Sequence, residues 1–266
     1  MISQVSKQNK KKKRRHTFRN LILVLILVVL VAFGTFWGAR LYHVYMTSTG
    51  KQDPDTPDAE EYPVQGVDVS YYQGTVDWDA LYEQGITFAF LKATEGVSHG
   101  DTSFAENWAS ALTSNVYVGA YHYYRFEEDG AAQAEHFIET VPYTENTLPP
   151  VVDVELYDSL TEEPDTDETV ENLQEMLETL ESYYGVKPIL YVATNCYLLY
   201  AQYFEGEYPI WISNYYYEPY IDWTFWQYTD EGALDGYDGD QQNIDLNVYA
   251  GTFAEFLAEF SLTEKT

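Results

Sequence analysis

The chain has 266 residues and a formal net charge of −29 at pH 7, and its charge is unevenly distributed. Nine of its 14 basic residues lie at or before Arg40, so residues 41–266 carry only five basic side chains against all 43 acidic ones. This balance argues against nucleic-acid binding by the larger part of the chain, because phosphate recognition depends on clustered Lys and Arg. A hydrophobic content of 45% supports a sizeable core, and a single cysteine, Cys196, excludes an intrachain disulfide.

The N-terminal region predicts a membrane anchor. Residues 20–39 carry no charge and are long enough to cross a bilayer as a helix. The preceding run KKKKRRHTFR is strongly basic, which predicts that residues 1–19 form a cytoplasmic tail and that the rest of the chain lies outside. A cleavable signal peptide is the competing interpretation. The apolar run is longer than a usual signal core and no clean Ala-x-Ala site follows it, so an uncleaved anchor is favoured.

Residues 40–63 predict an acidic linker. The stretch from 47 to 63 holds three prolines and many acids, with almost no large apolar residue before Tyr62. We therefore expect one folded domain over residues 64–266.

Short apolar runs alternate with helical patterns through this domain. We expect strands at 64–70, 86–93, 116–124, 149–155, 187–193, 208–215, 222–229 and 243–249. We expect helices at 76–85, 103–115, 130–141, 167–185, from about Asn195, and at 251–260. Strand and helix alternate five times, and the last three strands have little helix between them. This order predicts an α/β fold whose parallel sheet closes into a barrel with some outer helices missing.

Acidic residues at strand ends are the first candidates for a site. Asp153 and Glu155 follow the apolar run of PPVVDVE, and side-chain alternation along a strand points both the same way. Asp68 lies near the end of the first strand and Asp245 lies in the eighth. Because reactive groups of such barrels gather at the carboxyl ends of the strands, we expect these four acids to converge.

Polar and aromatic residues end the other strands, and they predict the walls of a substrate cleft. They are Lys92, Glu95, Tyr121, His122, Tyr191, Trp211, Trp226 and Gln227. Tyr and Trp offer flat apolar faces to sugar rings. A lone tyrosine at a strand end is more often a packing residue, so the prediction depends on the whole set.

Crowded carboxylates suit the cleavage of a glycosidic bond. One acid protonates the leaving oxygen, and a second supports the oxocarbenium-like transition state. Neighbouring acids disfavour the ionisation of Glu155 and help it to keep its proton near neutral pH. Metal binding is the rival use, but the chain has no EF-hand loop, and DGYDGDQQNID at 235–245 resembles a calcium loop only loosely. No phosphate loop, dinucleotide motif or Gly-x-Ser-x-Gly is present, so we expect no metal and no cofactor.

Eight motifs in fixed order resemble a known family. They are GVDVSYYQGTVDW, FLKATEG, GAYHYYRF, PPVVDVE, ILYVATNCY, PIWISNY, FWQYTDEG and NIDLNVYAGT. Together they resemble the family 25 glycoside hydrolases, which are lysozymes acting as N-acetylmuramidases, over about residues 64–255. The resemblance implies a flattened (β/α)5β3 barrel that hydrolyses the β-1,4 bond between N-acetylmuramic acid and N-acetylglucosamine in peptidoglycan.

The resemblance also implies roles for the matching residues. Glu155 would be the general acid, and Asp153 would stabilise an oxazolinium or act more directly. Asp68 and Asp245 would shape the charge and position this pair. The remaining candidates would line the sugar cleft: Tyr121, Tyr191, Trp211, Trp226 and Gln227, with Lys92, Glu95 and His122 nearby.

Two departures from the family pattern bear on the biology. Arg125-Phe126 stands where many relatives have Arg-Pro, and the domain is very acidic for a protein that engages an anionic wall. The acidity fits a single-pass protein of the bacterial cell membrane that remodels its own cell wall. The alternatives are a wall-binding domain without turnover and a scaffold that binds partners.

Overall fold

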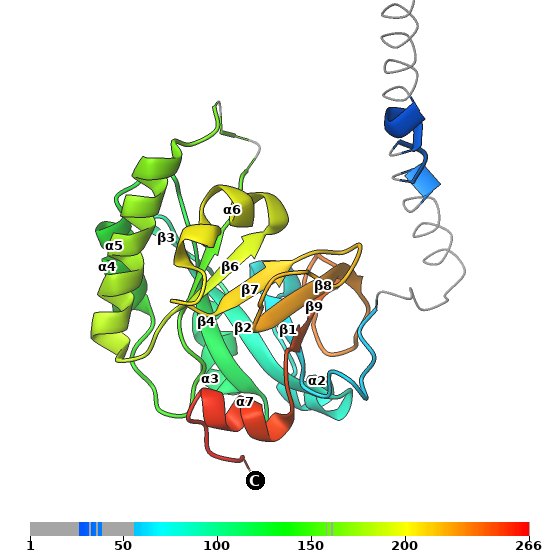
Figure 1. The fold of residues 1–266 in the computed structure, drawn as a ribbon. Coiled ribbons are helices and arrows are strands. Elements are labelled where there is room, and N and C mark those ends of the chain that lie inside the picture. The colour runs from blue at the N-terminus through cyan, green and yellow to red at the C-terminus, as the bar shows by residue number, and fades with distance from the viewer. Residues whose placement is uncertain are drawn as a thin grey trace, which may run out of the picture. The chain divides into compact units, whose positions relative to one another are not determined.

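The computed structural model describes residues 27–31, 33–35, 37–38, 56–157, 159–160 and 162–265 (Figure 1). The chain divides into two compact units, Met1–Pro54 and Asp55–Thr266. In the first unit the described residues are helical and expose apolar side chains such as Leu27 and Phe33. None of the helices among the described residues is long and apolar enough to cross a membrane. Much of the predicted anchor, and all of the tail at 1–19, lie outside these residues.

The described part of the second unit contains a closed barrel of eight strands. Its strands in chain order are β1 (Gln65–Val69), β2 (Ile86–Glu95), β4 (Tyr117–Tyr123), β5 (Val151–Val154), β6 (Ile189–Ala193), β7 (Ile210–Ser213), β8 (Phe225–Gly232) and β9 (Ile244–Tyr249). The neighbours are β1-β9-β8-β7-β6-β5-β4-β2, and pairing of β1 with β2 closes the ring. A two-residue strand, β3 (His99–Gly100), pairs with the end of β2. The predicted α/β barrel is therefore confirmed.

One strand runs against the expected direction. β9 is antiparallel to both of its neighbours, β1 and β8, whereas the other neighbouring barrel strands are parallel. The prediction of a parallel sheet is wrong at this strand. The reason is the missing helix, since a loop of 233–243 can return the chain only as a hairpin, while a parallel neighbour requires a crossover.

Helices cover the outside of the barrel and one of its ends. They are α2 (Trp78–Glu83), α3 (Phe104–Ala111), α4 (Gly130–Thr140), α5 (Thr166–Tyr184), α6 (Thr194–Leu199) and α7 (Phe253–Glu259), with short 3-10 turns η1 (Tyr71–Gln73) and η2 (Ala201–Phe204). Acidic residues begin three of them, because Asp77, Asp129 and Asp165 each accept a hydrogen bond from a backbone N–H of the first turn. Gly185 ends α5 in a left-handed conformation.

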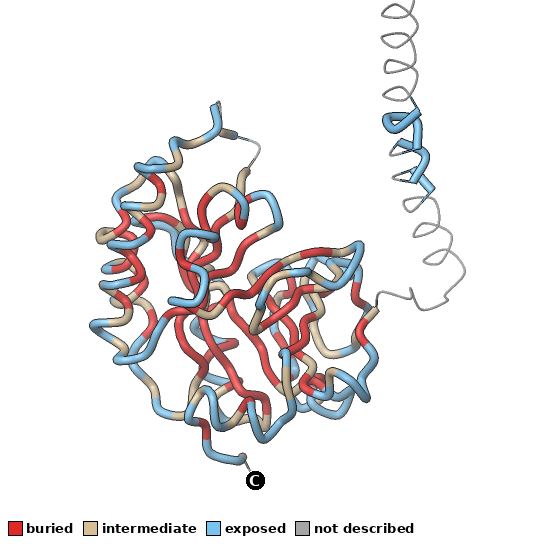
Figure 2. Tube along the Cα trace, viewed as in Figure 1, coloured by how far each residue is buried: buried red, intermediate tan, exposed pale blue. Residues whose placement is uncertain are grey.

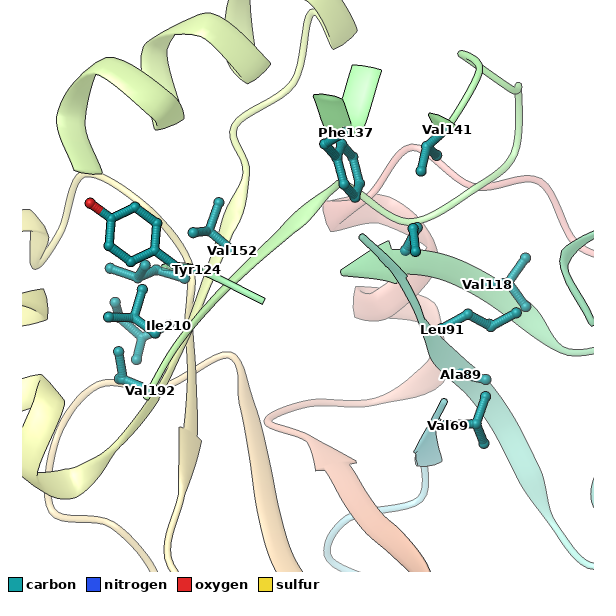
Figure 3. Packing of buried hydrophobic residues seen from close by; sticks show 14 of the residues in the cluster. Val69, Ala89, Leu91, Val118, Tyr124, Phe137, Val141, Val152, Val192 and Ile210 are labelled. Atoms are coloured by element: carbon teal, nitrogen blue, oxygen red, sulfur yellow. The ribbon is translucent and has the colours of Figure 1, made fainter. Parts of the chain in front are cut away.

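Each barrel strand separates two layers of buried side chains. Most of the strand residues are buried and are coloured red in Figure 2. The outer layer lies between strands and helices and is largely aliphatic; Figure 3 shows part of it, including Leu91, Val152 and Phe137. The inner layer fills the barrel and is largely aromatic, with Phe90 stacked on Trp211 at a centroid distance of 4.7 Å. Alternation along each strand assigns successive residues to opposite layers. That alternation decides which side chains reach the inside.

The inner layer also explains which end of the barrel is open. Phe256 of α7 contacts Phe88 and Tyr249 inside the barrel, with ring centroids 5.9 Å and 5.4 Å apart. α7 therefore closes one end, near the C-terminus in Figure 1. Gly66 has to lack a side chain, because a Cβ there would overlap the Phe88 ring. The opposite end, where the parallel strands finish, is free for polar side chains.

Candidate active site

The open end of the barrel holds a cavity of about 320 Å³. It is lined by the four predicted acids, Asp68, Asp153, Glu155 and Asp245. Five of the predicted cleft residues line it as well: Lys92, Tyr121, Tyr191, Trp211 and Gln227. The spatial convergence expected from the strand ends is present, although the chain positions involved span residues 68 to 245.

Strand register brings these residues together. Asp68 on β1 lies directly opposite Asp245 on the antiparallel β9. Asp153 on β5 is paired in register with Tyr191 on β6, which in turn is paired with Trp211 on β7. Residues in register around a barrel lie at a similar height, so their inward side chains meet in one layer.

Gln227 connects four side chains of this layer. Its Oε1 accepts hydrogen bonds from the hydroxyls of Tyr191 at 2.9 Å and Tyr215 at 2.8 Å. Its Nε2 donates to Asp68 Oδ1 at 2.9 Å and lies 3.5 Å from Asp245 Oδ2. Since donors meet the oxygen and acceptors meet the nitrogen, the amide has one favourable orientation. Gln227 therefore fixes the aromatic wall relative to the acids.

Asp68 and Asp245 form a pair that shares a proton. Burial raises the pKa of both, and the neighbouring Asp68 charge helps to raise the pKa of Asp245 to about 9. Hydrogen bonds from Asn247 Nδ2, at 2.7 Å, and from Gln227 favour the Asp68 carboxylate and oppose its upward pKa shift. The hydrogen bond between the two carboxyls raises the pKa of Asp245 and lowers that of Asp68, so a proton held between them favours Asp245.

Asp153 and Glu155 also resist ionisation together. Burial and then the Glu155 charge raise the pKa of Asp153 well above its ordinary range. Burial also raises the pKa of Glu155, with the Asp68 charge adding to it and the Tyr191 hydroxyl opposing it. Among the described side chains, the buried Asp153 Oδ1 has no hydrogen-bond partner. Such an oxygen is costly unless it meets a proton or a ligand, so the pair is arranged for chemistry rather than for stability.

Lys92 supplies positive charge at the cavity that holds these acids. Its Nζ donates to Glu95 Oε2 at 2.8 Å and lies 4.7 Å from the centroid of the Tyr123 ring. Its charge lowers the pKa of Asp153 and of Glu155, against the effect of burial. Glu95 itself does not line the cavity, and its contribution is the contact that holds Lys92.

Trp226 was expected in the cleft, and the structure corrects this. It is 2% exposed and belongs to the outer layer, while its neighbours Phe225 and Gln227 point inward. Its ring packs against Trp223, with centroids 5.9 Å apart, and its Nε1 donates to Asn214 O at 2.8 Å. Neighbouring residues of a strand cannot both face the barrel interior.

The same alternation of side chains along a strand excludes His122 from the cleft. Tyr121 and Tyr123 face inward on β4, so His122 between them faces α4 and is fully buried. Its Nδ1 lies 2.7 Å from Thr94 Oγ1, and its Nε2 lies 3.1 Å from Gln133 Oε1. Burial lowers the pKa of His122 to about 4, so it is a neutral packing residue.

Several cavity residues had not been singled out from the sequence. They are Ser70, Tyr72, Gln73, Tyr123, Tyr215, Asp230 and Gln241. Asn247 was missed as well; it joins Asp68 to the Trp211 Nε1, which donates to Asn247 Oδ1 at 2.8 Å. The alternation of side chains along a strand predicts Tyr123 and Asn247, since they lie two positions from Tyr121 and Asp245 and so face the same side. The loop residues carry no such periodic signal.

Known proteins resemble this chain over most of the part that forms the barrel. The family model described as glycosyl hydrolases family 25 matches residues 67–237. The uncharacterized protein YegX of Escherichia coli strain K12 is 34% identical over 206 residues, which is 74% of this chain and 73% of its own length. Lysozyme M1 of Streptomyces globisporus is 28% identical over 217 residues, covering 75% of this chain and 72% of its own.

Solved structures share the fold. A family 25 glycosyl hydrolase from Bacillus anthracis has 41% sequence identity and a TM-score of 0.72, covering 77% of this chain and 97% of that chain. A bacterial lysozyme from Streptomyces coelicolor has 27% identity and a TM-score of 0.68, covering 74% of this chain and 96% of its own.

Proposed function

This chain belongs to glycosyl hydrolase family 25, and from that premise we propose that it is a lysozyme. The reaction proposed is hydrolysis of the β-1,4 bond between N-acetylmuramic acid and N-acetylglucosamine in peptidoglycan. The observation that carries the proposal is the single cavity lined by Asp153, Glu155, Asp68 and Asp245. Lysozyme M1, a relative over three quarters of this chain, supports the same reaction class.

Glu155 is the proposed general acid. Its raised pKa keeps the carboxyl protonated beyond the range of an exposed glutamate, which is what donation to a leaving oxygen requires. Asp153, with its unpartnered buried oxygen, is proposed to stabilise the positive charge that develops on the sugar or on its acetamido group, because such a charge lowers the pKa that burial raises and favours the carboxylate. The Asp68–Asp245 pair holds a fixed negative charge beside them. Tyr121, Tyr191 and Trp211 are proposed to contact the sugar rings.

We also propose that the protein is anchored in a bacterial cell membrane with the barrel facing the cell wall. The support is the uncharged run at 20–39 after a strongly basic segment. Tethering raises the local concentration of enzyme at the wall, which offsets the repulsion between an acidic domain and an anionic polymer. Fractionation of cells and protease treatment of protoplasts test it. A membrane-bound chain cut from outside supports the anchor, and a chain in the soluble fraction contradicts it.

The reaction is tested by digesting purified peptidoglycan, reducing the products with borohydride and identifying the new ends by mass spectrometry. A lysozyme of this kind exposes N-acetylmuramic acid, so the reduced ends should be muramitol derivatives. New N-acetylglucosaminitol ends would assign a different bond. Absence of new ends from a folded full-length chain would contradict hydrolysis and favour a wall-binding domain.

A further inference from the structure

The residues that lead into the barrel, 56–64, form a lead-in segment folded onto the second unit. Pro57 is buried, and the backbone N–H of Tyr62 donates to Asp58 O at 2.8 Å, which closes a turn. Gln65 Nε2 donates to Tyr62 O at 2.7 Å. The expected linker therefore ends several residues before Val64. Tyr62 projects from a backbone that is fixed on both sides.

Tyr62 contacts the loop between β7 and β8, residues 214–224. Its hydroxyl donates to Glu218 Oε1 at 2.7 Å, a bond strengthened by the carboxylate charge. Its ring lies 5.7 Å from the Trp223 ring and meets Trp226 edge-on at 6.5 Å, measured between centroids. The lead-in segment thus holds the middle and the end of the loop.

The start of the same loop reaches the acids. Trp226 Nε1 donates to Asn214 O at 2.8 Å, and Asn214 N donates to Gln227 O at 3.1 Å. The next residue, Tyr215, lines the cavity, and its hydroxyl donates to Gln227 Oε1 at 2.8 Å. A continuous series of contacts therefore runs from Tyr62 outside the barrel to Gln227 within it.

We propose that Tyr62 is a positioning residue for glycan binding, acting through the β7–β8 loop to hold Tyr215 at the cleft. The inference rests on the proposed function, because a glycan is the ligand concerned. The loop has no regular secondary structure between Asn214 and Thr224, so few backbone bonds restrain it. Without Tyr62 the loop has to be ordered when substrate binds, and that cost weakens binding. The acids lie on strands β1, β5 and β9 or directly after β5, outside the loop, so the chemical step is little affected.

The test measures kcat and KM of the full chain on a soluble peptidoglycan fragment. We expect Tyr62→Ala to raise KM about fivefold with kcat within about twofold, and Tyr62→Phe, which loses only the hydroxyl, to raise KM about twofold. The matched control is Tyr82→Phe on α2, an exposed tyrosine that belongs neither to the loop nor to the lead-in segment, which should leave both constants unchanged. Adding Tyr62→Ala to Tyr215→Phe should raise KM by less than the product of the single effects, because both act on one contact.

Three results would overturn the inference. One is a KM for both Tyr62 variants equal to that of the control, even if the melting temperature falls. Another is a double variant, Tyr62→Ala with Tyr215→Phe, whose rise in KM equals the product of the two single rises. The third is a loss confined to kcat. If Tyr62→Ala does not fold, Tyr62→Phe alone decides through its KM. A parent chain that neither binds nor cleaves the fragment would instead overturn the proposed function.

Discussion

The inner and outer faces of the same barrel strands have opposite chemistry. Inward residues such as Asp68 and Asp153 create a mouth in which burial raises the pKa of both carboxyls, and the charges of neighbouring acids raise the pKa of Asp153 further. The outward residues beside them, Val67 and Val152, are apolar and pack under the helices. The inner face therefore gives up stability to hold reactive groups, while the outer face supplies the packing that keeps them in place. Variants on the two faces should separate activity from stability.

The largest expected effect is on the inner face, at Glu155. Glu155→Gln keeps the shape and removes the proposed proton donor, so kcat should fall about 10²–10⁴-fold. Stability should stay the same or rise, because the variant no longer buries an ionisable group. Reducing-end release and thermal unfolding of the same preparations check both statements. A variant that retains a tenth of the parent activity would contradict the role of Glu155.

Neighbouring residues of β4 provide the sharpest contrast between the faces. Tyr121→Phe alters the cleft, where the hydroxyl lies near the acids, and should lower kcat/KM about tenfold with little change in stability. His122→Leu removes the hydrogen-bond partner of Thr94 Oγ1 and one of the several partners of Gln133, and should cost about 1–3 kcal/mol of unfolding free energy. Its kcat/KM should stay within about threefold of the parent value. Steady-state kinetics and urea unfolding would reveal a reversed pattern, which would refute the assignment of faces.

A smaller effect is expected from Lys92. Its charge lowers the pKa of Asp153 and Glu155, so Lys92→Met should raise both pKa values. Glu155 would then keep its proton to higher pH, and the alkaline limb of the kcat/KM profile should move upward by up to about one pH unit. Lys187→Met is the control, since Lys187 contacts Glu207 O and the Tyr208 ring away from the cleft. A limb that moves downward, or moves equally in the control, would argue against this effect.

The smallest effect concerns stability and pH at Asp245. The pKa of Asp245 in the folded chain, about 9, lies above its pKa in the unfolded chain. Its contribution to stability is therefore complete only at low pH, where both states hold the proton. Between the unfolded and the folded pKa, the unfolded chain has released the proton while the folded chain still holds it. The free energy of unfolding therefore falls as pH rises through this range, and the loss is complete above the folded pKa. Asp245→Asn should therefore melt a few degrees above the parent at pH 8–9, at about 2–4 °C per kcal/mol, with a smaller difference at pH 5. The exposed control Asp240→Asn should show no such pH-dependent gain.

Much of the fold is predictable because strands and helices here have clear periodicity. The expected strand at 86–93 is β2, and the expected helix at 167–185 is α5, with ends shifted by two residues or fewer. The direction of β9 was not predictable from its own residues, because it depends on the missing crossover helix. The acids and prolines of the lead-in segment are typical of a tether. The residues that contact the Tyr62 side chain, Glu218, Trp223 and Trp226, lie far along the chain.

The site was predictable in part for the same reason. Strand ends identify which segments meet, so the four acids were found together. The prediction that Trp226 and His122 line the cleft is wrong, because each lies between two inward residues of its strand. The sequence does contain this alternation. The bonds that join Gln227 and Asn247 to Asp68 connect residues 159 and 179 positions apart, and no local pattern encodes such partners.

The most direct test of the central claim is a crystal structure of the Glu155→Gln chain with a peptidoglycan tetrasaccharide. The account predicts that the sugars occupy the inner-face mouth, with the scissile glycosidic oxygen within about 2.6–3.2 Å of the amide at position 155. Asp153 should then lie beside the reacting sugar, its unpartnered oxygen now in contact with ligand. A glycan bound elsewhere, or a scissile bond out of reach of position 155 in an otherwise unchanged barrel, would contradict the claim.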